Sequence, residues 1–366
     1  MNKFKSIPIQ SNIYTQSNFT PTFNEMSTIE KITKKNQIGK IISTYRKYKR
    51  NKNQTISSQY SNENVTTQSL SSYIEYIGNR DLQGNKSGFG IQKMKDGGFF
   101  RGMFLKDKVN GWGIFEHKDG HLYRGEYKND RTCGYGEYSN GDGVIYYGYW
   151  IDDVQYGIGF EIWNDSSQYS GEYNNGKKDG IGTYIWKDKT IYMGEWRDNS
   201  IHGYGIYQYL DGRQYAGEWK DNKMDGYGEF NWIEGKKYFG YYKQDKKDGF
   251  GIYYWPNNKF FVGFWKDGKQ HGIGKFMKGR AIRYGVWKEG KREKWIDNEN
   301  DFSNLINTDN EKYIYIFQWN LEQMQNFMEL NNEEEDEYGT ENNRIITLDN
   351  KRIEEEEEEN SDNYNN

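Results

Sequence analysis

The strongest constraint on this chain is a Gly-x-Gly pair that returns every 23 residues without a slip. A fixed period of this length is typical of repeat proteins, in which each unit packs mainly on its neighbours. We therefore expect an elongated array of similar units. The first glycines of the pairs are Gly88, Gly111, Gly134, Gly157, Gly180, Gly203, Gly226, Gly249 and Gly272.

Each unit has further regular positions, which we count from its first glycine as position 0. Glycine fills positions 0, 2 and 14, Tyr or Phe fills position 12, and an aromatic residue fills position 16 in eight successive units. Turn residues stand at positions 8–9, as in Asp96-Gly97, and a second polar turn spans positions 18–21. Two strands and two turns per unit predict a β-hairpin repeat.

The glycines and the aromatic residues all stand at even positions. Since side chains alternate between the two faces of a strand, these residues are expected to share one face. A ring on one strand can then lie over a glycine of the next strand. Each contact between rings would add about 0.5–1.5 kcal/mol to area burial, which offsets the cost of glycine in strands.

The stretch "YAGEWKDNKMDGYGEF", residues 215–230, resembles the MORN motif (membrane occupation and recognition nexus). Two other copies keep the His-Gly of that motif, at His202 and His271. The resemblance covers residues 73–295. It implies an all-β fold, a single elongated, twisted antiparallel sheet of about nine stacked 23-residue hairpins, with a groove along one face. Local departures are Asp165-Ser166, Asp188-Lys189, Pro256 and a missing residue before Gly285.

Charge divides the rest of the chain. Residues 1–72 carry eleven Lys and Arg against three acids, and residues 296–366 carry four against twenty-one. We predict disorder over 1–28, a short basic amphipathic helix over 29–52, a linker over 53–72 and the repeat array over 73–295. A linker and a second short helix follow over 296–330, and an acidic disordered tail over 331–366. The helix, "YIFQWNLEQMQNFMEL", would place Phe317, Leu321, Met324 and Met328 on one side, to cap the sheet or to dock a partner.

No reactive constellation stands out. The Gly-x-Gly pairs do not open helices as nucleotide-binding loops do. His117 and His121 flank a turn without a cysteine nearby, so a metal site is not expected. The lone Cys133 excludes an internal disulfide, fits a reducing compartment and is read as a turn residue. No secretory or membrane-spanning segment is visible. We therefore expect no enzyme activity, no cofactor and no nucleic-acid partner.

An aromatic row is the first candidate site. Position 6 becomes aromatic in the later units, beside the Trp residues of position 16. One interpretation is that these rings fill a thin core; the other is that they line a groove that grips a protein partner. The candidate groove residues are Trp150, Trp163, Trp186, Trp196, Tyr209, Trp219, Trp232, Trp255 and Trp265.

A basic row at position 20 is the second candidate. Such a row could contact acidic phospholipid, although Asp residues in the same turns would cancel much of the attraction, so we expect weak or no membrane binding. The alternative function is a membrane-tethering module, or a regulator of a phosphatidylinositol phosphate kinase. The row consists of Lys108, Arg131, Lys177, Lys223, Lys246 and Lys269.

The segment "KIISTYRKYKRN" resembles a degenerate IQ motif, the helix that calmodulin and other EF-hand proteins bind. Ile41 and Arg46 match the motif, whereas Ile42 replaces its glutamine. A plain surface helix or a lipid-contacting helix are the other interpretations. The candidate calmodulin-binding residues are Ile41, Ile42, Tyr45, Arg46, Tyr48 and Arg50.

Together these features predict a non-enzymatic scaffold that presents its repeat groove to a protein partner. The resemblance to MORN-repeat proteins implies a cytoplasmic, cytoskeletal or ciliary location. This inference is by analogy, because a fold does not determine a function.

Overall fold

The computed structural model describes residues 73–297 together with residues 301–302, 305, 316–317, 322–326 and 328. Residues 73–296 form twenty β-strands. They are β1 (Tyr73–Arg80), β2 (Lys86–Met94), β3 (Phe99–Leu105), β4 (Lys108–Glu116), β5 (Leu122–Lys128), β6 (Arg131–Ser139), β7 (Ile145–Ile151), β8 (Val154–Ile162), β9 (Gln168–Asn174), β10 (Lys177–Ile185), β11 (Ile191–Arg197), β12 (Ser200–Gln208), β13 (Gln214–Lys220), β14 (Lys223–Asn231), β15 (Lys237–Lys243), β16 (Lys246–Trp255), β17 (Lys259–Lys266), β18 (Lys269–Lys278), β19 (Ala281–Lys288) and β20 (Lys291–Ile296).

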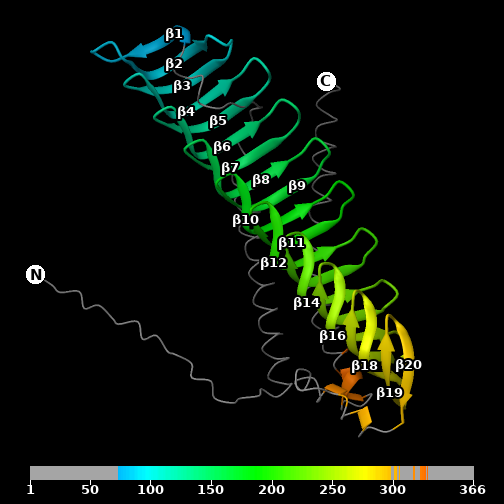
Figure 1. The fold of residues 1–366 in the computed structure, drawn as a ribbon. Helices are drawn as coiled ribbons and strands as arrows, with labels where there is room; N and C mark the ends of the chain where they lie inside the picture. Colours follow the sequence, from blue (N-terminus) through cyan, green and yellow to red (C-terminus); the bar gives the residue numbers. More distant parts are fainter. Residues whose placement is uncertain are drawn as a thin grey trace, which may run out of the picture.

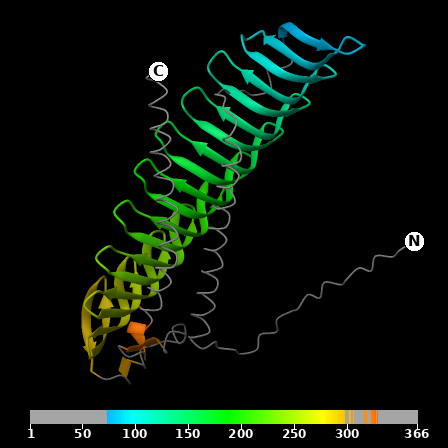
Figure 2. The same ribbon diagram turned by 180° about the vertical axis from the view of Figure 1, so that it is seen from behind.

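Every strand pairs antiparallel with the next strand along the chain, so the sheet is one continuous meander. Figures 1 and 2 show a long, twisted ribbon of stacked hairpins with open edges at β1 and β20. This confirms the predicted all-β fold. The two terminal strands are the partial units expected at the ends of a repeat array.

The turns at positions 18–19 are two-residue turns with positive φ at both residues. Asp198 (φ 47) and Asn199 (φ 67) are one example. This is the type I′ geometry that suits the twist of a hairpin, and Asp and Asn tolerate it better than most residues. The turn is shorter than predicted, because the next strand resumes at position 20. Cys133 therefore lies in β6, half-buried, and the interpretation of it as a turn residue is wrong.

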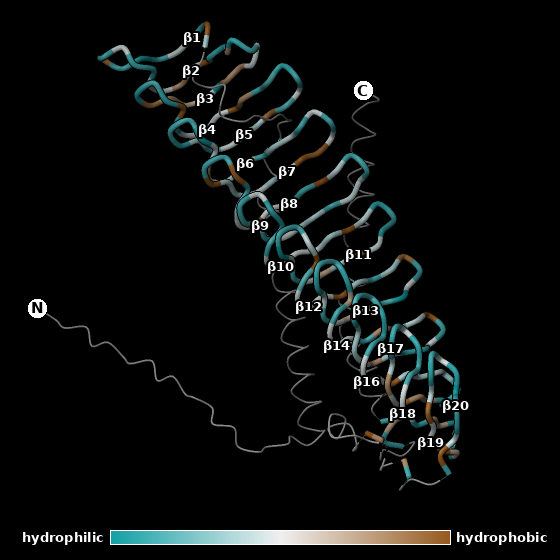
Figure 3. The backbone as a smooth tube through the Cα atoms, viewed as in Figure 1, coloured by the Kyte–Doolittle hydropathy of each residue, from teal (hydrophilic) through white to brown (hydrophobic). Residues whose placement is uncertain are grey.

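Each of these turns is hydrogen-bonded to the start of the strand that follows the corresponding turn of the preceding unit. The Oδ1 atom of Asn222 accepts a hydrogen bond from the backbone N–H of Ile201 at 2.8 Å, and the N–H of Asn222 donates to the Ile201 carbonyl at 2.9 Å. The same bond from a backbone N–H to a turn side chain recurs along this edge, with Asp107, Asp130, Asp153, Asn199 and Asp245 as acceptors. Figure 3 shows these tight turns as largely hydrophilic.

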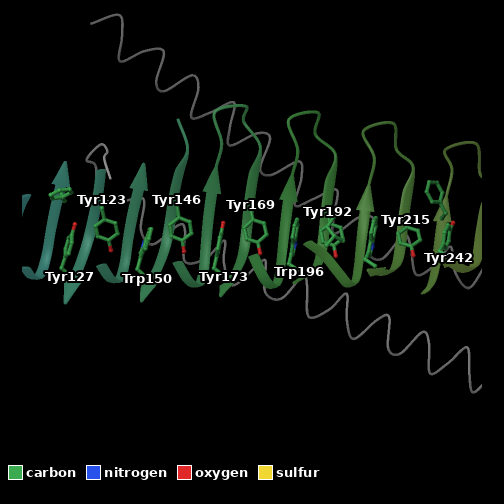
Figure 4. Packing of buried hydrophobic residues seen from close by; sticks show 14 of the residues in the cluster. Tyr123, Tyr127, Tyr146, Trp150, Tyr169, Tyr173, Tyr192, Trp196, Tyr215 and Tyr242 are labelled. Atoms are coloured by element: carbon green, nitrogen blue, oxygen red, sulfur yellow. The ribbon is translucent and has the colours of Figure 1, made fainter. Parts of the chain in front are cut away.

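The core is a single layer of rings on the even-position face. Tyr192 lies over two paired glycines, since a Cβ on Gly194 or Gly205 would approach its hydroxyl oxygen to 2.3 Å. The Tyr192 hydroxyl donates to the carbonyl of Glu195 at 2.9 Å. Its ring makes an edge-to-face contact with Trp196, with centroids 5.4 Å apart. Figure 4 shows this arrangement repeated along the ribbon, so the predicted pairing of rings with glycines is confirmed for positions 2 and 14.

Position 0 has a different reason for glycine. Gly226 has φ +112 and lies in a β-bulge of β14, where the register against β13 shifts between Gly217 and Trp219. A Cβ there would approach the Glu218 carboxylate to 2.6 Å, and no ring stands over it. The expectation that this glycine also makes room for a ring is therefore wrong. It permits the bulge, a conformation in which L-residues are strained.

The opposite face of the ribbon is covered at its C-terminal end. Phe250, Phe260 and Met277 lie in a buried cluster with Phe302, Ile316, Phe317, Met324 and Met328 of the following segment. The Nζ atom of Lys275 donates to the carbonyl of Phe317 at 2.6 Å. Residues 301–302, 316–317, 322–326 and 328 are helical, and Figure 2 shows these pieces beside the last strands. Leu321 lies outside the described residues.

Candidate functional site

The Trp side chains of position 16 form the floor of the even-position face. Trp150, Trp196, Trp219 and Trp265 are 7–8% exposed. Three of them donate an indole N–H to a glycine carbonyl of the adjacent strand; for Trp219 the acceptor is Gly205, at 3.2 Å. The indole nitrogen of Trp265 is buried without a hydrogen-bond partner among the described residues. These residues contribute to the core and offer little surface to a partner.

The rings of position 6 lie against this floor and remain partly exposed. We call them the aromatic row: Trp163, Trp186, Tyr209, Trp232 and Trp255. Each contacts a ring of position 4; the Tyr253 and Trp255 centroids, for example, are 4.4 Å apart. The row therefore continues through five successive units from β8 to β16. Of the predicted groove residues, these five are the ones that present ring surface to solvent.

Lysines lie among the rings of this face, and the sequence interpretation had missed them. Lys86 in the first unit lies 3.8 Å from the Tyr73 centroid and donates a hydrogen bond to Gln92, whereas Lys178 and Lys247 are part-buried beside the aromatic row. Lys178 Nζ lies 4.7 Å from the Trp163 centroid and 5.1 Å from that of Tyr169. It forms an ion pair with Glu161 at 3.5 Å, and that carboxylate also accepts a hydrogen bond from Tyr173 at 2.8 Å. Burial lowers the pKa of Lys178, and the Glu161 carboxylate opposes the shift. We call this group the Lys178 cage.

The Lys247 cage is the equivalent group three units later. Lys247 Nζ lies 4.7–5.0 Å from four ring centroids. Burial lowers the pKa of this lysine to about 8. No carboxylate forms an ion pair with it among the described residues. Its rings are Trp232, Tyr238, Tyr253 and Trp265.

A signal for these cages was present in the sequence. Two positions before the first glycine, most units have an uncharged residue such as Ile201 or Met224, whereas lysine stands there at Lys86, Lys178 and Lys247. Because this is an even-face position, its side chain points among the rings. A cation held there is attracted to the faces of Trp and Tyr.

The basic row lies along the edge of the tight turns, at the first residue of its strands. Three of its members form ion pairs across adjacent turns, and Lys223 donates to Gln244 at 2.9 Å. Aspartates of the adjacent turns thus pair with half of this row. The ion pairs join Arg131 to Asp152 (3.6 Å), Lys177 to Asp198 (2.7 Å) and Lys246 to Asp267 (3.1 Å); Lys108 and Lys269 are the remaining members.

The opposite face carries a second apolar surface near the N-terminal end. Phe89 and Met103 are cross-strand partners and are 56% and 41% exposed, and Trp112 in the next unit is 53% exposed. These residues occupy odd positions 1 and 15, which the repeat pattern leaves variable. The signal that could have found them is the change at position 15 from Met103 to glutamate in later units such as Glu195.

Other predictions fall elsewhere. The IQ-like residues Ile41, Ile42, Tyr45, Arg46, Tyr48 and Arg50 lie outside the described residues. Within the described part of the chain, no group of His, Cys, Asp and Glu is arranged to hold a metal ion. Within that same part, none of the helical segments has the length and apolar character needed to cross a membrane.

Solved structures give low similarity. The TCP domain of SAS-4 (dCPAP) of Drosophila Melanogaster, in complex with a proline rich motif of Ana2 (dSTIL), is 8% identical with a TM-score of 0.29, over 42% of this chain and 84% of that chain. The CPAP G-box domain is 10% identical with a TM-score of 0.30, over 55% of this chain and 100% of that chain. Similarities at these TM-scores carry no weight for the function of this chain.

The family comparison agrees with the geometry of the units. No curated protein matches the chain. The family model described as MORN repeat matches six segments between β5 and β18, at residues 123–144, 169–191, 192–212, 215–237, 238–259 and 261–278. These are hairpin units with the glycine–ring pairing described above, and the matches support a MORN-repeat protein.

Proposed function

We propose that this protein is a non-enzymatic scaffold that binds a protein partner on the aromatic row. MORN repeats are typical of such scaffolds, and a rigid ribbon of hairpins presents its side chains at fixed spacing. The observation that carries the proposal is the row itself. Five partly exposed rings stand in successive units over a floor that is already buried, and such exposed aromatic surface is favoured at interfaces.

The test uses rings whose removal leaves the floor intact. Trp196 and Trp219 are unsuitable because they are buried, and their loss would unfold the units. We propose proximity labelling in the native cell with the full chain carrying Trp232→Ala and Trp255→Ala. Partners of the row should disappear from the labelled set. The matched control, Phe89→Ala with Trp112→Ala on the opposite face, should retain them. An identical labelled set for all three chains would contradict the proposal.

The basic segment 29–52 extends the proposal to an EF-hand partner. Its support is the resemblance of residues 40–51 to an IQ motif and the basic, amphipathic pattern around Ile41 and Tyr45. A peptide covering residues 31–52 should bind calmodulin at micromolar strength or better. Absence of binding both with and without calcium would remove this part of the proposal.

Acidic lipid is the alternative ligand, and the ion pairs along the turn edge argue against it. A flotation assay with phosphoinositide vesicles separates the two functions, since lipid binding through the basic row would weaken steeply with salt. The cytoskeletal or ciliary location stays a prediction from the family resemblance.

A further inference from the structure

The two lysine cages occupy the same position of the repeat, three units apart. Lys178 and Lys247 both stand two residues before a position-0 glycine. Two of their rings correspond position by position, since Trp163 and Tyr169 near the first lysine become Trp232 and Tyr238 near the second. The remaining rings differ: Tyr173 lies 5.9 Å from the Nζ atom of Lys178, whereas Tyr253 and Trp265 complete the Lys247 cage.

The cages differ in their anion. Glu161 supplies a carboxylate that accepts from both Lys178 and Tyr173. Phe230 occupies the equivalent position in the later unit. Its ring packs on Trp232, with centroids 4.3 Å apart, and gives no acceptor. Lys247 therefore shares a Trp and a Tyr ring with Lys178 at equivalent positions, without the carboxylate that accompanies Lys178.

A second cation lies on the same part of the aromatic row. Lys259 Nζ is 4.5 Å from the centroid of Trp255, the last ring of the row. Among the described residues, no acidic side chain forms an ion pair with Lys259. This end of the row is therefore both aromatic and cationic. Lys236 nearby is neutralised by Glu234.

A buried ammonium without a counter-ion is destabilising, because burial removes water that the rings replace only in part. An anion that arrives with a ligand would restore the missing interaction in a site shielded from water, where a charge-assisted hydrogen bond is strong. Lys247 and Trp232 are both only partly buried, which gives such an anion access to the ammonium group. At Lys178 the chain itself supplies the anion, through Glu161.

We propose that the Lys247 cage binds an aspartate or glutamate carboxylate of the protein partner, flanked by apolar residues that pack on Trp232 and Trp255. The inference rests on the proposed function of the aromatic row and names the chemistry of its partner. Glu161 is the internal precedent: its carboxylate accepts from the equivalent lysine, whose Nζ atom lies 4.7 Å from the Trp163 centroid. The neighbouring cation, Lys259, favours further acidic residues in the same segment.

The experiment selects binders from a library of random linear displayed peptides on the full chain. Selected peptides should be enriched in Asp or Glu next to apolar residues. Lys247→Met should weaken their binding by about tenfold or more, the loss expected for one charge-assisted contact. Phe230→Glu should weaken it similarly, because it places a carboxylate where Glu161 stands in the other cage. The matched control, Lys178→Met, should change binding less than about twofold.

The outcomes separate the two proposals. Binders that are lost with Trp232→Ala and Trp255→Ala, but are not enriched in acids and tolerate Lys247→Met, would overturn the carboxylate site and leave the aromatic row standing. Failure to select any binder that depends on Trp232 and Trp255 would overturn the proposed function itself. Circular dichroism of each variant establishes that the sheet has formed. Because Lys247→Met and Phe230→Glu change different residues, one of them still tests the proposal if the other unfolds its unit.

Discussion

The Lys178 and Lys247 cages show how a repeat protein can keep a geometry and change its chemistry. Both lysines lie beside one Trp and one Tyr at equivalent positions, yet one has Glu161 and the other has Phe230. The first cage is electrostatically complete within the chain. The second is not, and burial alone determines the lowered pKa of its lysine. A single position in the unit thus decides whether a cage stabilises the ribbon or is left open to a ligand.

The largest expected effect is at the completed cage. Glu161→Leu removes the carboxylate from Lys178 and Tyr173, which leaves a part-buried ammonium without its anion, and we expect a loss of about 3 kcal/mol in the stability of these units. Hydrogen exchange resolved along the chain, combined with urea unfolding, measures it, because long arrays need not unfold in one step.

The control is the exposed pair of Arg101 and Glu116. There Glu116→Leu should cost less than about 1 kcal/mol, since water already solvates both partners. Equal losses for the two variants would show that the Glu161 carboxylate is no more important than a surface charge, and the contrast between the cages would disappear.

Removing each lysine should move stability in opposite directions. Lys178→Met leaves Glu161 in a part-buried site without its cation, and we expect a loss of about 2 kcal/mol. Lys247→Met removes a desolvated charge that has no counter-ion, and we expect a gain of about 1 kcal/mol near neutral pH, reduced by the lost cation–π attraction. Unfolding midpoints in urea at pH 7 give both values. Loss of stability in both variants would mean that the rings of the Lys247 cage alone compensate for the desolvation of the Lys247 ammonium group.

Much of this could be predicted from the sequence, because the features concerned repeat. Because the unit repeats through eight exact steps of 23 residues, the hairpins, the even-position core and the pairing of rings with glycines could be predicted from the alternation of side chains. The particular pair of Tyr192 and Gly205 could not, since the sequence does not give the strand register. The bulge at Gly226 could not be predicted, since the sequence shows only a glycine, whether that glycine is needed for a positive φ or for close packing against a ring. The cages were not predicted either. A lysine at one position of the unit departs from the repeat pattern, and its contacts become evident only once neighbouring strands bring their rings together around it.

The pH dependence of Lys247 gives a smaller effect. Its pKa is lowered from 10.5 to about 8 in the folded protein. Between these values the unfolded chain holds more protons, so the stability contributed by this group rises as pH increases. Relative to Lys247→Met, the intact protein should gain about 2 kcal/mol between pH 8 and pH 10. Tyrosine ionisation affects both proteins equally and cancels. A constant difference across this range would show that Lys247 is not desolvated.

The smallest effect concerns the turn that precedes each cage. Ser166 in the unit of Glu161 corresponds to Gly235 in the unit of Phe230, and both have positive φ, at 68 and 75. Their N–H groups donate to the carbonyls of Trp163 and Trp232 in the same way. Ser166→Gly should therefore relieve strain without changing a contact.

The expected gain from Ser166→Gly is about 0.5–1 kcal/mol, because the left-handed conformation costs an L-residue more than the extra freedom of glycine costs in the unfolded chain. The reverse change, Gly235→Ser, should lose at least as much, since a Cβ there also approaches Pro256 to 3.3 Å. Urea unfolding of the two variants measures both. A loss of stability with Ser166→Gly would show that the freedom of the unfolded chain outweighs the strain in the turn. The difference between the two units would then lie in the anion of the cage and not in turn strain.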